Sequence, residues 1–258
     1  MEKISVIIQG EVWPKTLENA EFYLQEFPFV DDVVISCWEP DAYIPSAPGV
    51  KVVRTRKFIQ VGYSNCNYQL VSTINGLKAA RNRLCVKTRS DQRIISLDRV
   101  YDHAMSHEVE PIRYLGGDIR EFPVYCLALH KIYPFHMQDH LIFGAKPDML
   151  KIFDIPLYPA RTLDPNGFVG FGKQPREPIY IGAYYCSLFD ARVKKFIDNY
   201  EEYLCDPNHQ KKEVKVVDSQ ITSKIFHPLP RLDIYWEKFN SAYWFERYEQ
   251  SGECYYEA

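Results

Sequence analysis

The chain has 258 residues and a formal net charge of −3, and 46% of its residues are hydrophobic. This length and composition suit one large α/β domain that buries a substantial core. The charge balance does not indicate a nucleic-acid-binding protein, which would need a clustered excess of lysine and arginine. No apolar run approaches the roughly 20 residues that cross a membrane.

The cysteines indicate a reducing compartment. There are seven of them, and no Cys-x-x-Cys pair occurs. Neither a disulfide framework nor a zinc site built from cysteines is therefore expected. Residues 1–3 lead directly into an apolar run, without the basic-then-apolar pattern of a signal peptide. We expect a cytoplasmic protein, which would reach membrane-linked molecules from the inner face of the cytoplasmic membrane.

Short β-branched runs alternate with segments of helical periodicity, which predicts an α/β fold. The predicted strands are residues 4–8, 32–38, 51–54, 84–90, 112–115, 124–129 and 141–144. The predicted helices are residues 17–27, 67–82, 96–106, 147–153 and most of 177–204. The first strand, helix and strand form a unit whose crossover should be right-handed. In broad terms this is the layout of a nucleotide-binding domain.

The later part of the chain is less regular. Residues 156–175 form a long loop with several glycines, and such loops are usually functional or mobile. Residues 205–215 are polar and predict a flexible connection, and a strand-like piece begins at Val216. We therefore expect a main domain over residues 1–205 and a C-terminal helical and aromatic extension over residues 206–258 that packs on it.

The extension ends in an aromatic segment, residues 235–248, that predicts a helix. Trp236, Phe239 and Tyr243 fall on one stripe of such a helix. Packing of this stripe against the main domain is the simpler interpretation. The alternatives are an interfacial helix on the cytoplasmic leaflet, which would make a peripheral membrane contact, and a contact with another subunit.

Asp91 is the first candidate for a functional residue. The run from Leu84 starts apolar and ends in this acid, which has Arg89 and Arg93 on its two sides. In open α/β sheets the ligand binds outside the carboxyl ends of the strands, which is where Asp91 should lie. The alternative is a loop acid that forms salt bridges with the two arginines.

Three blocks of the sequence match the sequence pattern of a known family, and they stand in the same order as in that family. The first block, ISVIIQG, ends in Gln9 and Gly10. The second has an Asn-x-Asn-x-Gln start and a Lys-x-Arg-(Ser/Thr)-Asp end, which are Asn65, Asn67, Gln69, Lys87, Arg89, Ser90 and Asp91. The third follows the pattern His-x-x-Asp-x-x-x-x-Gly, with His136, Asp139 and Gly144. Over about residues 3–190, the chain resembles the WavE lipopolysaccharide-synthesis family, which belongs with the GT-A-type glycosyltransferases.

The resemblance implies a GT-A-like, Rossmann-like mixed sheet flanked by helices. It implies a glycosyltransferase that moves a sugar from a nucleotide-sugar donor to a glycan or glycolipid acceptor, in the synthesis of lipopolysaccharide or capsule. It also implies substrate-binding roles for a set of polar residues, namely Gln9, Asn67, Gln69, Arg89, Asp91 and His136.

A divalent cation is implied less directly. Many such enzymes hold Mg²⁺ or Mn²⁺ with an Asp-x-Asp pair, but Arg89-Ser90-Asp91 has a single carboxylate. Asp91 would then hold a metal with a ligand from late in the chain, such as His227. Alternatively, Asp91 would bind hydroxyl groups of the donor while arginines neutralise the phosphates.

An inverting transfer needs a carboxylate to accept the proton of the attacking hydroxyl. Asp139, in the third block, and Glu177, at the start of a predicted helix, are the two candidates. The helix macrodipole would lower the pKa of Glu177 and make it a weaker base. We therefore expect Asp139 to be the base and rank Glu177 second.

Some of these residues have simpler explanations. Asn67 could cap its helix. His136 and His140 are four residues apart and would share one face of a helix, as metal ligands do. The glutamate and third ligand of a zinc hydrolase are absent at the expected spacing, so that class is a minor alternative.

Two further function classes stay open. A nucleotidyltransferase acting on sugar nucleotides would want a glycine-rich, basic loop after the first strand, and residues 9–13 offer little of it. The chain also lacks the glycine fingerprint of dinucleotide sites and the P-loop pattern. A non-catalytic glycan-binding or assembly protein is the other class, and an assay of donor hydrolysis would separate it from an enzyme.

Overall fold

The computed structural model describes residues 1–39, 43–58, 65–120, 122–129, 134–158, 177–199, 203–204, 212–229 and 236–238. Its strands are β1 (Ile4–Gln9), β2 (Val30–Glu39), β3 (Val50–Arg56), β4 (Leu84–Arg89), β5 (Gln92–Ile94), β6 (Ile112–Arg113), β7 (Ile119–Arg120), β8 (Val124–Cys126), β9 (Leu141–Ala145), β10 (Phe226–Pro228) and β11 (Trp236–Lys238). Its helices are α1 (Thr16–Glu26), α2 (Cys66–Ala79), α3 (Leu97–Ser106), α4 (Lys146–Phe153), α5 (Glu177–Ser187), α6 (Ala191–Asp198) and α8 (Lys212–Ile225).

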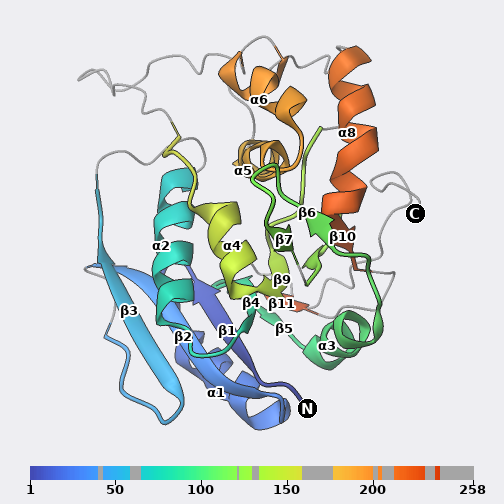
Figure 1. The fold of residues 1–258 in the computed structure, drawn as a ribbon. Coiled ribbons are helices and arrows are strands. Elements are labelled where there is room, and N and C mark those ends of the chain that lie inside the picture. The colour runs from blue at the N-terminus through green and yellow to red at the C-terminus, as the bar shows by residue number, and fades with distance from the viewer. Residues whose placement is uncertain are drawn as a thin grey trace, which may run out of the picture.

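The main sheet is mixed and has seven strands in the order β10-β8-β9-β4-β1-β2-β3 (Figure 1). Strands β1 to β4 run parallel to their neighbours in this group, whereas β9 is antiparallel to both β4 and β8. The predicted α/β fold with a mixed sheet is therefore confirmed.

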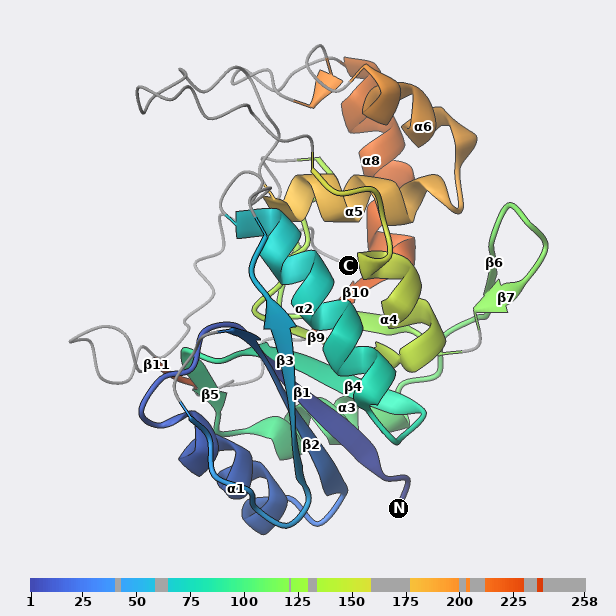
Figure 2. The ribbon, with the colours of Figure 1, turned by 90° about the vertical axis from the view of Figure 1, so that its left-hand side faces the viewer.

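Helices cover both faces of the sheet, with α2 and α4 on one side and α1 and α3 on the other (Figures 1 and 2). Strand β1 is buried on both faces, because Ile7 packs into the core under α2 while Val6 and Ile8 pack into the core over α1. A continuous β-branched run is what such a strand requires. Helices α5, α6 and α8 pack on one another beyond α4.

The order of the strands creates a switch point between β1 and β4. The chain goes from β1 outward to β2 and β3, and then returns to place β4 on the opposite side of β1. The carboxyl ends of these two strands lie side by side, with Gln9 in register with Arg89. Crevices at such points are where open α/β sheets bind ligands.

The segment before β9 is held between two helices. The backbone N–H of Phe135 donates to the Asp218 carboxylate of α8 at 2.8 Å. On the other side, α5 approaches through Gly182, where an added Cβ would lie 1.9 Å from the carbonyl oxygen of Phe135. Only glycine allows this approach, and it fixes the segment that leads to Asp139.

The residues after 205 differ from the prediction. Val216 lies in α8 and not in a strand, since Val214, Val217 and Ile225 are buried at helical spacing. Trp236 lies in β11, which pairs antiparallel with β5, and not in an aromatic helix. The rest of that predicted helix lies outside the described residues. Strand β10 joins the edge of the main sheet beside β8.

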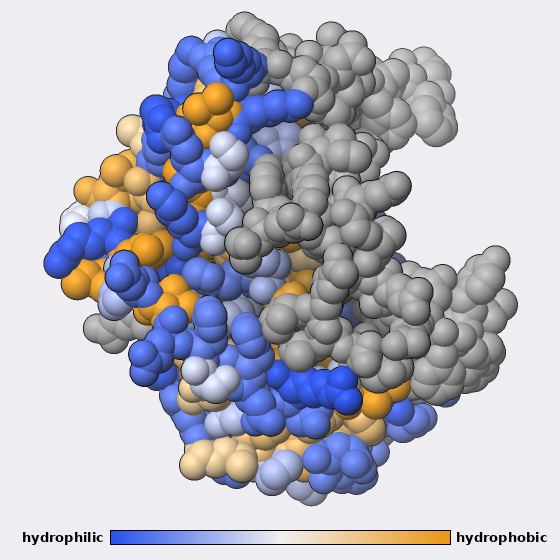
Figure 3. Space-filling view, turned by 90° about the vertical axis from the view of Figure 1, so that its right-hand side faces the viewer, coloured by the Kyte–Doolittle hydropathy of each residue, from blue (hydrophilic) through white to orange (hydrophobic). Residues whose placement is uncertain are grey.

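The described surface is mostly hydrophilic on the face that Figure 3 draws, with hydrophobic residues scattered among polar ones. Such single apolar residues are normal for a protein surface. Within the described ranges, no helix combines the length and the apolar character that crossing a bilayer demands.

Replacing Gly182 with alanine should lower the free energy of unfolding by about 1–3 kcal/mol, because the new methyl group would meet the Phe135 backbone. This loss should exceed the gain in helix propensity, which is at most about 1 kcal/mol. Gly116→Ala is the matched control, since its Cβ would meet nothing within 4 Å, and it should change stability by less than about 0.5 kcal/mol. Urea denaturation of both variants measures the difference. Equal stabilities would contradict the described packing of α5.

Candidate active site

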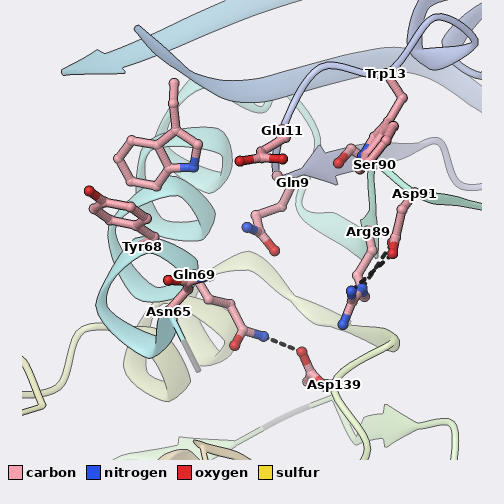
Figure 4. Close-up of a pocket in the computed structure, with 12 residues that line it drawn as sticks. Gln9, Glu11, Trp13, Asn65, Tyr68, Gln69, Arg89, Ser90, Asp91 and Asp139 are labelled. Atoms are coloured by element: carbon pink, nitrogen blue, oxygen red, sulfur yellow. Dashed lines mark hydrogen bonds and ion pairs between the residues drawn. The ribbon is translucent and has the colours of Figure 1, made fainter. Parts of the chain in front are cut away.

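A cavity of about 260 Å³ lies outside the carboxyl ends of β1, β2 and β4 (Figure 4). Five of the residues predicted from the sequence line it together, namely Gln9, Gln69, Arg89, Asp91 and Asp139. The cavity therefore occupies the switch point of the sheet, as expected for Asp91 from its position after a strand.

The floor of the cavity depends on a close approach between the ends of β1 and β4. Gly10 has a φ of +134°, and a Cβ built on it would lie 2.5 Å from the Ser90 Oγ. The Ser90 N–H donates to the Gln9 carbonyl oxygen at 2.9 Å. Glycine is needed here both for its backbone conformation and for its lack of a side chain.

Arg89 and Asp91 form a two-point ion pair. The Nε and Nη2 atoms of Arg89 donate to Oδ1 and Oδ2 of Asp91 at 2.9 and 3.0 Å. Burial alone would raise the pKa of Asp91, but the Arg89 guanidinium holds that pKa below its usual value. Asp91 is thus both a cavity residue and a salt-bridged loop acid. Arg93, the second arginine beside Asp91 in the sequence, forms an ion pair with Glu18 at 2.9 Å.

A fully buried lysine lies behind the other side of the cavity. Lys87 donates to the backbone oxygen of Asp139 at 2.6 Å and to its Oδ2 at 3.2 Å. The Nε2 of Gln69 donates to the same carboxylate oxygen (Figure 4). Burial alone would raise the pKa of Asp139, but the Lys87 ammonium holds it well below its usual range. Asp139 is therefore a weak base, which argues against its predicted catalytic role.

Two other predicted substrate-binding residues do not line the cavity. Asn67 is fully buried and clamps the backbone of Tyr158, accepting from its N–H at 2.6 Å and donating to its carbonyl oxygen at 2.9 Å. It does not line the cavity, and it is not the N-cap of α2, which is Asn65. His136 is also buried and belongs to a segment that turns before β9. Because this segment is not helical, His136 and His140 do not share a helix face, which was the condition for the minor alternative of a zinc hydrolase.

The structure does not bring His227 to Asp91. His227 of β10 pairs with Tyr125 of β8, which pairs with Phe143 of β9, which in turn pairs with Val86 of β4. Three strand spacings of about 4.8 Å therefore separate His227 from β4, and Asp91 lies beyond the far end of that strand. Arg120 is a polar neighbour of His227, 3.4 Å from its Nε2.

The described residues do not fit the divalent cation that the resemblance implies. No group of three or more His, Cys, Asp or Glu side chains within them is arranged to hold a metal ion. Both oxygens of Asp91 accept from Arg89, and Oδ2 of Asp139 accepts from Lys87 and Gln69.

Glu177 is the first residue of α5, and its side chain lies outside the described residues. One turn further along, Tyr180 donates to the Pro156 carbonyl oxygen at 2.9 Å, and its ring lies 4.6 Å from that of Tyr158. Since Tyr158 is bonded to Asn67 of α2, the start of α5 lies beside the helix that carries Gln69.

Several cavity residues were missed at the sequence level, namely Glu11, Trp13, Trp38 and Tyr68. Trp38 and Tyr68 are in contact, with ring centroids 4.5 Å apart. The exposed Glu11 lies two residues after the end of β1, and Trp38 lies near the end of β2. The argument that singled out Asp91, a position after the carboxyl end of a strand, would have found Glu11, whereas Tyr68 lies in α2 and no such signal marks it.

The fold and this cavity define an α/β protein with a ligand site at the switch point of its sheet. The sequence model of the family described as WavE lipopolysaccharide synthesis matches residues 34–221. The match covers more than half of the chain, so the protein belongs to this family. The predicted family is thereby confirmed, and with it a part in lipopolysaccharide synthesis.

Three solved structures illustrate the similarity. TarS of S. aureus has 13% identity and a TM-score of 0.45, over 86% of this chain and 70% of its own. HddC from Yersinia pseudotuberculosis has 12% identity and a TM-score of 0.36, over 60% of this chain and 80% of its own. The mannosyltransferase PcManGT from Pyrobaculum calidifontis, in complex with GDP-Man and Mn²⁺, has 10% identity and a TM-score of 0.40, over 72% of this chain and 52% of its own. No curated protein matches the chain significantly. Similarities this weak support no argument about function.

Replacing Lys87 with methionine should lower the free energy of unfolding by about 3–5 kcal/mol, because it leaves the Asp139 carboxylate buried without its cation. The double variant Lys87→Met/Asp139→Asn should recover part of this loss. Chemical denaturation at neutral pH measures both. Arg83→Met is the control, since Arg83 forms an exposed pair with Glu2, and it should cost less than about 1 kcal/mol.

The ion pair between Lys87 and Asp139 should also make the free energy of unfolding depend on pH. The pKa of Asp139 is lower in the folded chain than in the unfolded chain, so its stabilisation is present above the unfolded value of about 3.9. The stabilisation is lost as the pH falls through the folded value. Acidification should therefore destabilise the wild type more steeply than the double variant, and parallel pH profiles would show that the pair is not coupled.

Proposed function

We propose that the protein transfers a glycosyl group from a nucleotide-sugar donor, bound in the cavity, to a hydroxyl group of a glycan or glycolipid acceptor. The acceptor would be a precursor of lipopolysaccharide or capsule, in keeping with the family. The observation that carries the proposal is the position of the cavity at the switch point between β1 and β4, where open α/β sheets bind nucleotides.

The lining residues suit the parts of such a donor. Trp38 and Tyr68 offer aromatic surface to a base or a sugar ring. The carboxylate of Glu11 can accept from two neighbouring hydroxyl groups of a ribose. The guanidinium of Arg89 matches the oxygens of a diphosphate.

The size of the cavity bears on where the acceptor binds. Its volume of about 260 Å³ is near the lower limit of roughly 300 Å³ for small-molecule sites. It would therefore hold part of the donor, while the acceptor would approach from outside. No resident metal ion enters this proposal, because Arg89 engages the carboxylate of Asp91 and Lys87 and Gln69 engage that of Asp139.

The reaction needs a proton acceptor. In an inverting transfer the acceptor oxygen bonds to the anomeric carbon, the bond from that carbon to the diphosphate breaks, and the hydroxyl proton passes to a base. Asp139 suits this role poorly because Lys87 and Gln69 hold its carboxylate. We therefore propose Glu177 as the base and give Asp139 the role of fixing Gln69 at the cavity wall.

Glu177→Gln should lower kcat for transfer by at least about 10²-fold while donor affinity stays unchanged. Asp139→Asn should instead weaken donor binding, since it loosens Gln69 and leaves Lys87 without a counter-charge. Steady-state kinetics and calorimetric donor titrations separate the two effects. Asp98→Asn, at an exposed acid of α3, serves as the control. If Asp139→Asn loses transfer with donor affinity intact, Asp139 is the base and the assignment to Glu177 is wrong.

A thermal-shift panel of nucleoside diphosphates and CMP tests the function itself. A ligand at about 100 times its dissociation constant stabilises the fold by about 2.7 kcal/mol, so the correct nucleotide should stand out. Sugar nucleotides carrying that base should then be hydrolysed slowly without an acceptor. Binding without any hydrolysis would favour a non-catalytic glycan-assembly protein. Release of pyrophosphate from a nucleoside triphosphate and a sugar phosphate would favour a nucleotidyltransferase.

A further inference from the structure

Arg89 is the more accessible member of its ion pair. Its side chain is 40% exposed, whereas that of Asp91 is 11% exposed. The acid therefore lies deeper than the guanidinium, at the turn where β4 ends. A molecule that enters the cavity would therefore contact the guanidinium of Arg89 more readily than the carboxylate of Asp91 (Figure 4).

The contacts of Asp91 suit a residue that orients a cation. Each of its two oxygens accepts from a different nitrogen of Arg89, and such a planar two-point contact fixes the plane of a guanidinium. Ser90, between the two residues, is buried, and its backbone N–H is bonded to the Gln9 carbonyl oxygen. The cation is therefore in position before a ligand binds, which is the arrangement that stabilises developing charge most effectively.

A divalent cation would compete with these contacts. To bind Asp91 it would have to share the carboxylate with Arg89, and it would then lie beside a positive charge that repels it. Asp139 is a poor substitute, because Lys87 and Gln69 hold its Oδ2 and the buried Lys87 ammonium, 3.2 Å away, would repel a second cation. Among the described lining residues this leaves the carboxylate of Glu11, and a single carboxylate is a minimal ligand set even for Mg²⁺.

We infer that Arg89 binds the diphosphate of the donor directly, without a divalent cation, and that Asp91 is the positioning residue for its guanidinium. The inference rests on the proposed function, because it assumes that the cavity receives a diphosphate. Paired N–H donors of a guanidinium match phosphate oxygens. Its charge would lie where the departing diphosphate becomes more negative.

Inorganic pyrophosphate is the probe that tests this inference. Isothermal titration calorimetry measures its affinity for the full chain in buffer with EDTA, and again with pyrophosphate supplied as its Mn²⁺ complex. The variants are Arg89→Gln and Arg83→Gln. Arg83 immediately precedes β4, at the strand end opposite Arg89, and pairs with Glu2. Its replacement therefore removes the same charge away from the cavity.

Wild type should bind in both buffers with affinities that agree within about threefold, and Arg83→Gln should match it. Arg89→Gln should bind at least about tenfold more weakly, as expected for the loss of charged hydrogen bonds. Asp91→Asn should fall between wild type and Arg89→Gln in EDTA, since the guanidinium keeps its charge but loses its orientation. Circular dichroism and the melting temperature of each variant establish that it is folded.

Each other result overturns part of the inference. Binding that requires Mn²⁺ would overturn metal-free binding and leave the cavity as the donor site. Equal affinities of wild type and Arg89→Gln would remove the role of Arg89, and complete loss of binding in Asp91→Asn would contradict its role as a positioning residue. If folded wild type bound neither pyrophosphate nor any nucleoside diphosphate, the proposed function would fall as well.

Discussion

The ion pair between Lys87 and Asp139 is the interaction on which the site most depends. A lysine with no exposed surface in a central strand is tolerated only when its charge is met by a partner. Here the partner lies in the segment before β9, and the same carboxylate accepts from Gln69 of α2. One buried cation therefore ties together three elements that meet at the cavity. Replacing the pair by apolar residues could preserve the fold, but it would leave Gln69 without its anchor.

Much of the framework could be predicted from the sequence. The β-branched run of β1, the helical spacing in α2 and the acid after β4 are local signals, and the structure confirms each of them. The failures lie where local signals conflict with tertiary contacts. In α8 the valines resemble a strand, but their buried members recur at helical spacing. In β11, pairing with β5 overrides the helical stripe of aromatic residues.

In the candidate site, too, local sequence signals were predictive and features that depend on tertiary contacts were not. Asn67 and Gln69 are two residues apart on a helix and cannot face the same way, so one pattern could not place both in the cavity. The sequence could not reveal which of them turns inward, because that depends on where α2 meets the sheet. Lys87 and Asp139 also stood in separate blocks, and only the antiparallel pairing of β4 with β9 brings their side chains together. His227 stayed apart because β8 and β9 lie between β10 and β4.

The pairing of β11 with β5 has a consequence for the order in which the molecule assembles. Strand β5 starts at the residue after Asp91, so the turn that carries the site acid is braced by a segment far away in the sequence. Contacts between distant segments form slowly, because the intervening chain must first be brought together. A ribosome would have to synthesise β11 before this brace could form. The growing chain could thus complete the β1–α1–β2 unit early, while its ligand site would become ordered among the last parts of the molecule.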